Sequence, residues 1–182
     1  HRPTQSKVLG GDGDTLLNHI FDRIIYGETE PNPELKNLRR QVVKHYDTGG
    51  LIDTPAYDFQ GQPPTTTRRL FKDYKGVANW IDANLANDLE AEEFRFITET
   101  DALGRVTQQT APDGSIITPF YNEAGLLNAE TVLHPHLANP TIYIKDIDYN
   151  EKGQRNKIVY GNNVISQFSY DKETFRLNRL ET

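Results

Sequence analysis

Four short stretches decide the fold of this chain: TDALG at residues 100–104, YNEAG at 121–125, YNEKG at 149–153 and YDKETF at 170–175. Each begins with Tyr or Thr, continues with Asp or Asn, and ends after two or three further residues in Gly or, once, in Phe. The starts lie 21, 28 and 21 residues apart. A period of this length indicates a repeat architecture, and a loop insertion of about seven residues at 134–140 accounts for the longer interval.

Each stretch has the chemistry of a turn. The Asp or Asn side chain can accept a hydrogen bond from the backbone two residues on, and Gly supplies the positive φ of a tight reversal. A second reversal lies between successive stretches, at APDGS (111–115) and at YGNNV (160–164). Pro, Gly and Asn occupy the positions there that favour turn geometry, including the left-handed position. The pattern therefore predicts that every repeat is a hairpin of two strands.

The repeats resemble a known family. The Tyr-Asp-x-x-Gly spacing, the Pro-Asp-Gly turn and the run from Tyr160 to Leu177 are similar to the YD repeats of bacterial Rhs proteins. The upstream sequence resembles, in order, the Rhs region of the B component of insecticidal toxin complexes. The segments that carry this second resemblance are Ile25–Glu28, Asn37–Arg39, His45–Asp47, Ala56–Gly61 and Asp73–Lys75. Together the two resemblances extend from Leu16 to the C-terminus.

The sequence departs from the family pattern at four positions. Thr100 stands in place of Tyr, and Asn163 stands where Gly is usual. Leu126 and Gln154 follow the Gly of their turns at a position where Arg is common. These departures concern the geometry of individual turns.

The resemblance implies a mainly β fold with a few helices, in which consecutive antiparallel YD-repeat hairpins form a curved sheet. It implies that this sheet is part of a larger hollow Rhs shell, which encloses a toxic C-terminal domain before delivery. The implied partners are the remainder of the same shell and other toxin-complex components, and the implied location is secreted, outside the bacterial cell. The alternative function is an extracellular carbohydrate- or receptor-binding β module, because an open sheet rich in Tyr, Asn and Asp can hold sugars.

Three segments are expected along the chain: a flexible N-terminal segment at 1–14, a helix-containing Rhs segment with short strands at 15–93, and the YD-repeat sheet at 94–182. Apolar residues at helical spacing predict a helix over 15–26 that covers an apolar sheet surface. They are Leu16, Leu17, Ile20, Phe21, Ile24 and Ile25. A four-residue repeat of Val77, Ile81, Leu85 and Leu89 predicts a second helical stretch within 75–93.

The remaining elements are a single helical turn and strands. The helical turn is expected at 34–38, after Pro31 and Pro33. Strands are expected at 40–46, 51–57 and 65–71, and then from 94 to 180 as consecutive antiparallel hairpins.

Composition excludes several classes of protein. A net charge of −6 and a pI near 5.4 argue against a nucleic-acid partner, which requires a basic face. The absence of Cys excludes disulfides and thiolate metal sites. No apolar run reaches the roughly 18 residues of a membrane-spanning helix, and no signal peptide opens the chain. The absence of Met indicates a piece of a longer protein.

Several residue groups contain catalytic or metal-binding residue types but fit ordinary structural roles better. Asp12 and Asp14 lie in a Gly-rich stretch, but their spacing fits neither the nonapeptide calcium repeat nor an EF-hand. His134 and His136 flank Pro135 in the inserted loop without an identifiable third ligand. The acidic group of Glu90, Glu92 and Glu93 fits a solvated helix face. No nucleophile, phosphate-binding or dinucleotide motif occurs. The sequence therefore predicts no enzyme activity, no catalytic residue, no cofactor and no metal.

Overall fold

The computed structural model describes residues 2–11, 16–81 and 85–182. Within these residues the chain is almost entirely antiparallel β-structure, as predicted. The first six strands are β1 (Gln5–Gly10), β2 (Leu17–Tyr26), β3 (Val42–Asp47), β4 (Gly50–Asp53), β5 (Thr65–Leu70) and β6 (Phe94–Thr100). The others are β7 (Val106–Thr110), β8 (Ile116–Tyr121), β9 (Leu127–Leu133), β10 (Thr141–Tyr149), β11 (Arg155–Tyr160), β12 (Ile165–Tyr170) and β13 (Leu177–Glu181). Two short 3-10 helices, η1 (Gly27–Thr29) and η2 (Leu85–Asp88), interrupt them.

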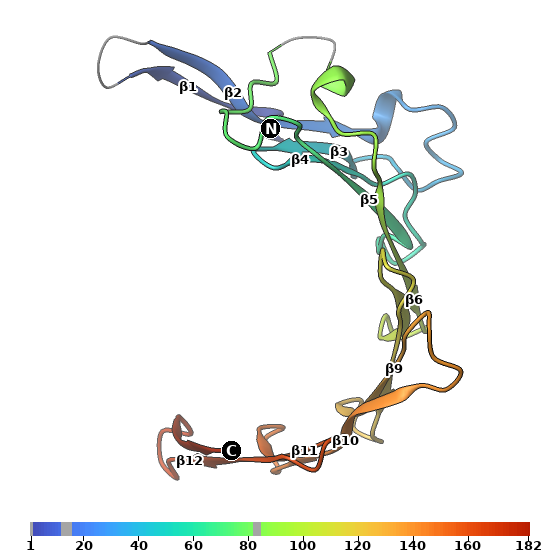
Figure 1. Ribbon diagram of the computed structural model, residues 1–182, viewed down its shortest axis with the longest axis vertical. Coiled ribbons are helices and arrows are strands. Elements are labelled where there is room, and N and C mark those ends of the chain that lie inside the picture. The colour runs from blue at the N-terminus through green and yellow to red at the C-terminus, as the bar shows by residue number, and fades with distance from the viewer. Residues whose placement is uncertain (1, 12–15, 82–84) are drawn as a thin grey trace. The chain divides into compact units, whose positions relative to one another are not determined.

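The chain divides into two compact units, residues 1–97 and residues 98–182. In each unit every strand pairs antiparallel with the next strand along the chain (Figure 1). This is the order expected of consecutive hairpins, and it confirms the predicted fold class. The division into segments at 1–14, 15–93 and 94–182 stays a prediction.

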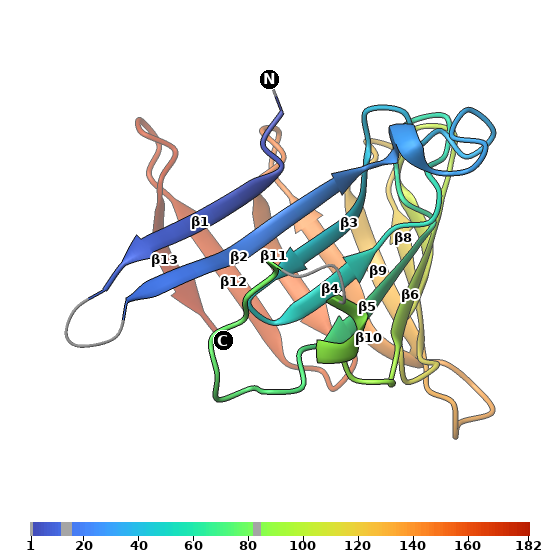
Figure 2. The ribbon, with the colours of Figure 1, turned by 90° about the horizontal axis from the view of Figure 1, so that it is seen from above.

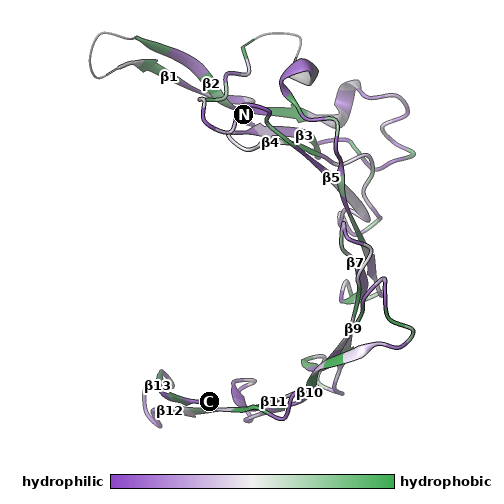
Figure 3. Ribbon diagram, in the orientation of Figure 1, coloured by the Kyte–Doolittle hydropathy of each residue, from purple (hydrophilic) through white to green (hydrophobic). Residues whose placement is uncertain are grey.

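Figure 3 shows hydrophilic and hydrophobic residues mixed along the strands. Burial alternates along β7, where half-buried and exposed residues follow one another from Val106 to Thr110. In the second unit Ile147, Ile158 and Ser166 lie opposite one another on β10, β11 and β12, and all three are buried. Residues directly opposite in register share a sheet face, so one face of this unit carries its buried residues.

The helix predicted over 15–26 is wrong, because residues 17–26 form the strand β2. Figure 2 shows β1 and β2 side by side as a long hairpin, and β3 pairs with the other edge of β2. The residues from Ile20 to Tyr26 are mostly β-branched or aromatic, which favours strands once neighbours are available to complete the hydrogen bonds. β1 itself lies within the segment that we expected to be flexible; residues 12–15 lie outside the described part of the chain.

The helical stretch predicted within 75–93 is also wrong, apart from the four-residue η2. Irregular chain instead lies against the sheet of the first unit. The backbone N–H of Trp80 donates to the Ile20 carbonyl at 2.8 Å, and the Asn79 side chain accepts from the Ile20 N–H at 3.1 Å. Irregular chain around Trp80 therefore covers this part of the sheet, in place of the helix over 15–26 that we expected to cover it.

The core of the first unit forms around this covering segment. Trp80 is completely buried, and its indole Nε1 donates to the Asp47 carbonyl at 3.0 Å. Its ring lies 5.2 Å from the ring of Tyr46 and 5.4 Å from that of Phe71, measured between centroids. The other buried members of this cluster are Ile20, Leu51, Ala78 and Leu89.

The shorter elements follow the prediction more closely. Strands expected at 40–46, 51–57 and 65–71 correspond to β3, β4 and β5, although β4 ends at Asp53. The helical turn expected at 34–38 is wrong, since residues 33–37 form non-helical turns. Asn32 and Asn37 have positive φ there, which breaks helical geometry.

Candidate functional site

The repeated turns are the most distinctive feature of the second unit. Three of the four begin with an Asp or Asn whose Oδ1 accepts two backbone N–H groups, from the residues two and four positions on. For Asp101 the donors are Leu103 at 2.8 Å and Arg105 at 3.0 Å. Asn122 and Asn150 make the same pair of bonds, each at 3.0 Å. The predicted turn chemistry is therefore confirmed.

Glycine closes three of these turns in the left-handed region. Gly104, Gly125 and Gly153 have φ of 76°, 75° and 73°. The fourth turn is one residue longer and ends in Phe175, with φ of 57°. Its Asp171 accepts from the backbone and the hydroxyl of Thr174, and these hydrogen bonds lower the pKa of the Asp171 carboxyl.

The intervening reversals also match the prediction. Gly114 has φ of 82°, and Asn163 takes the left-handed position with φ of 69°. Asp113 accepts the backbone N–H of Ser115 at 2.9 Å, and Asn162 accepts that of Val164 at 3.0 Å.

We expect Gly114→Val to lower the free energy of unfolding by about 1 to 3 kcal/mol, because a β-branched residue resists positive φ. An added Cβ would also lie 3.3 Å from Pro135 Cγ. Urea denaturation followed by circular dichroism measures the loss. Thr107→Val, at an exposed position in β7, is the control and should change stability by less than about 0.5 kcal/mol. Equal stability of the two variants would contradict the turn assignment.

The tyrosines of the repeats have a role that sequence reasoning missed. Four Tyr hydroxyls donate to backbone carbonyls of a neighbouring strand or the residue that opens it. The bonds join Tyr57 to Val42, Tyr121 to Val106, Tyr149 to Leu127 and Tyr170 to Arg155, at 2.6, 2.9, 2.6 and 2.9 Å. Each hydroxyl ties the end of a repeat hairpin to its beginning.

The number of residues between the Tyr donor and its carbonyl acceptor follows the repeat. Donor and acceptor are 15 residues apart in three cases and 22 in the case of Tyr149. The difference of seven equals the length of the insertion at 134–140. The loop therefore lengthens its hairpin without breaking the bond. Because the acceptor is a backbone carbonyl, which every residue carries, the sequence holds no residue-type signal for it.

We expect Tyr149→Phe to lower the free energy of unfolding by about 1 kcal/mol, because the Leu127 carbonyl loses its partner. Tyr74→Phe is the matched control, since Tyr74 is 85% exposed. Thermal melts of both variants provide the comparison. A loss no larger in Tyr149→Phe than in Tyr74→Phe would show that this hydroxyl bond contributes nothing.

The histidines weighed as metal ligands occupy different environments. His136 is exposed, whereas His134 uses both ring nitrogens within the protein. His134 Nδ1 lies 3.2 Å from Ser115 Oγ, and Nε2 lies 2.9 Å from the Tyr143 hydroxyl. Ser115 Oγ in turn donates to Asp113 at 2.8 Å. The order Asp–Ser–His differs from a nucleophilic triad, in which His lies between the other two.

The remaining candidates do not converge. Glu92 and Glu93 are exposed, and Glu90 bonds through its backbone to Leu70, all on irregular chain and not on the helix face that we expected. Asp12 and Asp14 lie outside the described residues. In the part of the chain that the structure describes, no three His, Cys, Asp or Glu side chains are grouped to hold a metal. The absence of a catalytic, cofactor or metal site stays a prediction.

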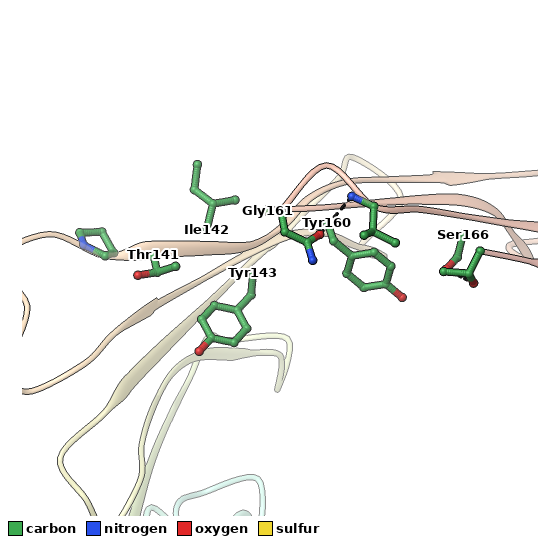
Figure 4. A pocket seen from close by; sticks show the side chains of 10 residues that line it. Thr141, Ile142, Tyr143, Tyr160, Gly161 and Ser166 are labelled. Atoms are coloured by element: carbon green, nitrogen blue, oxygen red, sulfur yellow. Dashed lines mark hydrogen bonds between the residues drawn. The ribbon is translucent and has the colours of Figure 1, made fainter.

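A groove of about 970 Å³ lies in the second unit, beside β10, β11 and β12 (Figure 4). Thr141, Tyr143, Tyr160 and Ser166 point to one side of the sheet, and Ile142 to the other. Ser166 Oγ lies 2.9 Å from Thr182 Oγ1. Among the described residues that line this groove there is no Asp, Glu, His, Lys or Arg, so the groove supplies no acid–base pair.

None of the helices in the described ranges is long and apolar enough to cross a membrane. No protein-family model matches the chain. The toxin subunit YenC2 of Yersinia entomophaga is 30% identical in an alignment of 169 residues that covers 90% of this chain. The chain spans 17% of that relative's length.

Solved structures of toxin complexes are also similar to this chain. The Tc holotoxin pore of Photorhabdus luminescens superimposes with a TM-score of 0.79 at 28% identity, over 96% of this chain and 8% of that one. The crystal structure of TcdB2-TccC3 superimposes with a TM-score of 0.76 at 29% identity, over 88% of this chain and 8% of that one. The likeness includes both the repeated turns and the upstream strands. This chain is a homologue of bacterial toxin-complex subunits, built from YD repeats of the Rhs type.

Proposed function

We propose that this chain is a structural segment of the hollow Rhs shell that encloses a toxic C-terminal domain before delivery. The observation that carries the proposal is the hairpin module itself, with its Asx turn and Tyr–carbonyl bond, in a chain similar to toxin subunits over nearly its whole length. Such modules add side by side, each in contact with its neighbours. In this proposal the chain is a structural part of the shell wall.

The outermost strand of the second unit supports this role. All residues of β13 are exposed, and Leu177 and Leu180 are 51% and 56% exposed. An edge strand with apolar side chains and unpaired backbone groups requires a cover in water. We propose that the remainder of the same shell provides this cover, and that the assembled shell contacts other components of a secreted toxin complex. The comparisons give no support to the alternative, a carbohydrate-binding module.

Protease protection of the full-length protein tests the proposal. With an intact shell we expect the C-terminal domain to resist a protease that digests the same domain expressed alone. Deletion of residues 98–182 should expose it to cleavage, whereas Tyr74→Phe should leave it protected. A C-terminal domain that stays equally resistant in the deletion protein, or that is cleaved equally in the unaltered protein, would refute the shell role. Hits for the chain on a glycan array would favour the binding module instead.

A further inference from the structure

A cavity of about 370 Å³ lies in the first unit and plays no part in the proposed shell function. It is lined by one face of β3 to β6 and by Leu89 and Glu93. We call it the mixed-charge cavity. Its volume falls within the range of small-molecule sites.

Four residues cross the floor of this cavity in a single row. Lys44 lies opposite Asp53, Asp53 opposite Thr67, and Thr67 opposite Arg95. Because neighbouring strands are roughly 4.8 Å apart, the row places a cation, a carboxylate, a hydroxyl and a second cation at regular steps. Thr67 is buried, with 9% of its surface exposed.

The next row on the same face is apolar at one end. Tyr46 lies opposite Leu51, and Leu51 opposite Arg69. Tyr46 and Leu51 are buried, and Leu89 borders the same cavity. The cavity therefore combines charges of both signs with an apolar wall.

Of the charged side chains that line the cavity, Arg69 donates through Nε to the Glu90 carbonyl at 3.0 Å. Within residues 2–11, 16–81 and 85–182, no ion pair closer than 4.0 Å includes a charged residue of this cavity. Burial raises the pKa of Asp53, the charge of Lys44 opposes that rise, and the charges of Glu30 and Glu93 add to it. Asp53 therefore has Lys44 as a cationic neighbour and Glu30 and Glu93 as acidic ones, and a second cation beside this group of carboxylates would be stabilised.

We propose that the mixed-charge cavity binds a free α-amino acid with an apolar side chain. The ammonium group lies against Asp53 and Glu93, and the carboxylate lies over Thr67 towards Arg95. The side chain contacts Tyr46, Leu51 and Leu89. Neighbouring positions of the row match the close spacing of the two charges in an amino acid, and both charges are required for the fit.

Titration of the 182-residue chain with L-leucine, followed by amide NMR shifts, tests the proposal. We expect saturable shifts in β3 to β5 with a dissociation constant of about 1 mM or tighter. Leucine methyl ester lacks the carboxylate and N-acetyl-leucine lacks the ammonium, so each should bind at least about tenfold more weakly. No saturable shift, or equal binding of either derivative, overturns the proposal.

Variants locate the site on the protein. Asp53→Asn and Arg95→Gln should each weaken L-leucine binding about tenfold or more, because each removes one charged partner. Asp148→Asn, at an exposed position of β10, is the matched control and should bind as the unaltered chain does. If Asp53→Asn keeps its circular dichroism spectrum and its affinity, the proposal is refuted. If that variant does not fold, the two leucine derivatives decide the outcome on the unaltered chain.

Discussion

Replacement of Trp80 by alanine is expected to lower the free energy of unfolding of the first unit by about 3 to 5 kcal/mol. Trp80 is completely buried, and the irregular segment that covers the sheet has this ring as its anchor. Its removal leaves a cavity between Tyr46 and Phe71 and takes away the donor to the Asp47 carbonyl. The cavity and the unpaired Asp47 carbonyl both lower the free energy of unfolding.

Hydrogen exchange read by mass spectrometry is the suitable measurement, because Trp80 is the single tryptophan and fluorescence is lost with it. We expect faster exchange in β2, β3 and β4 and little change in residues 98–182. Phe59→Ala is the control, since Phe59 is an aromatic residue that is 84% exposed. If the Trp80→Ala and Phe59→Ala variants show the same hydrogen-exchange rates in β2, β3 and β4, Trp80 does not hold the covering segment against the sheet.

Gly161→Ala is expected to lower the stability of the second unit by about 3 kcal/mol or more, because backbone must move to admit a methyl group. A Cβ on Gly161 would lie 1.7 Å from the carbonyl oxygen and 2.7 Å from the carbonyl carbon of Ile142. The N–H of Gly161 donates to the Tyr143 carbonyl at 2.9 Å, so a shift that relieves the clash also breaks this bond.

A second glycine separates the effect of space from that of backbone angle. At Gly153 a Cβ would meet only Leu126 Cδ1 at 3.7 Å, but φ is 73°. Gly153→Ala should therefore cost about 1 kcal/mol, from backbone strain alone. Urea denaturation of both variants gives the difference. If Gly161→Ala lowers the free energy of unfolding no more than Gly153→Ala does, the backbones at Gly161 and Ile142 move apart without loss of stability and the prediction is wrong.

The turns of the repeat sheet were predictable because their chemistry is local. The Asx bond of Asn122 reaches only two and four residues along the chain, and the positive φ of Gly125 belongs to one residue. Information of this kind is contained in a short window of sequence. The hairpins, and with them the order of the strands, follow from the turns.

The tyrosine and glycine contacts were not predictable in the same way. The Tyr149 hydroxyl reaches Leu127 across 22 residues, and its partner is defined only when the hairpin has formed. Gly161 stands at a turn where a positive φ would be the usual reason for glycine, yet the structure requires it there for the space beside Ile142. The mixed-charge cavity likewise depends on register, which brings together Lys44, Thr67 and Arg95 from three strands.

The sequence by itself determined the antiparallel hairpins, their turns and the Rhs resemblance, because short-range backbone chemistry repeats at a readable period. Tertiary structure alone decided the state of residues 17–26. Their apolar residues fit a helical stripe, but in the strand Ile20 is buried while the adjacent Phe21 is 37% exposed. β1 and β3 complete the backbone hydrogen bonds of this segment on both edges. Local propensity depends on the residues of the segment alone and therefore does not include these pairing partners.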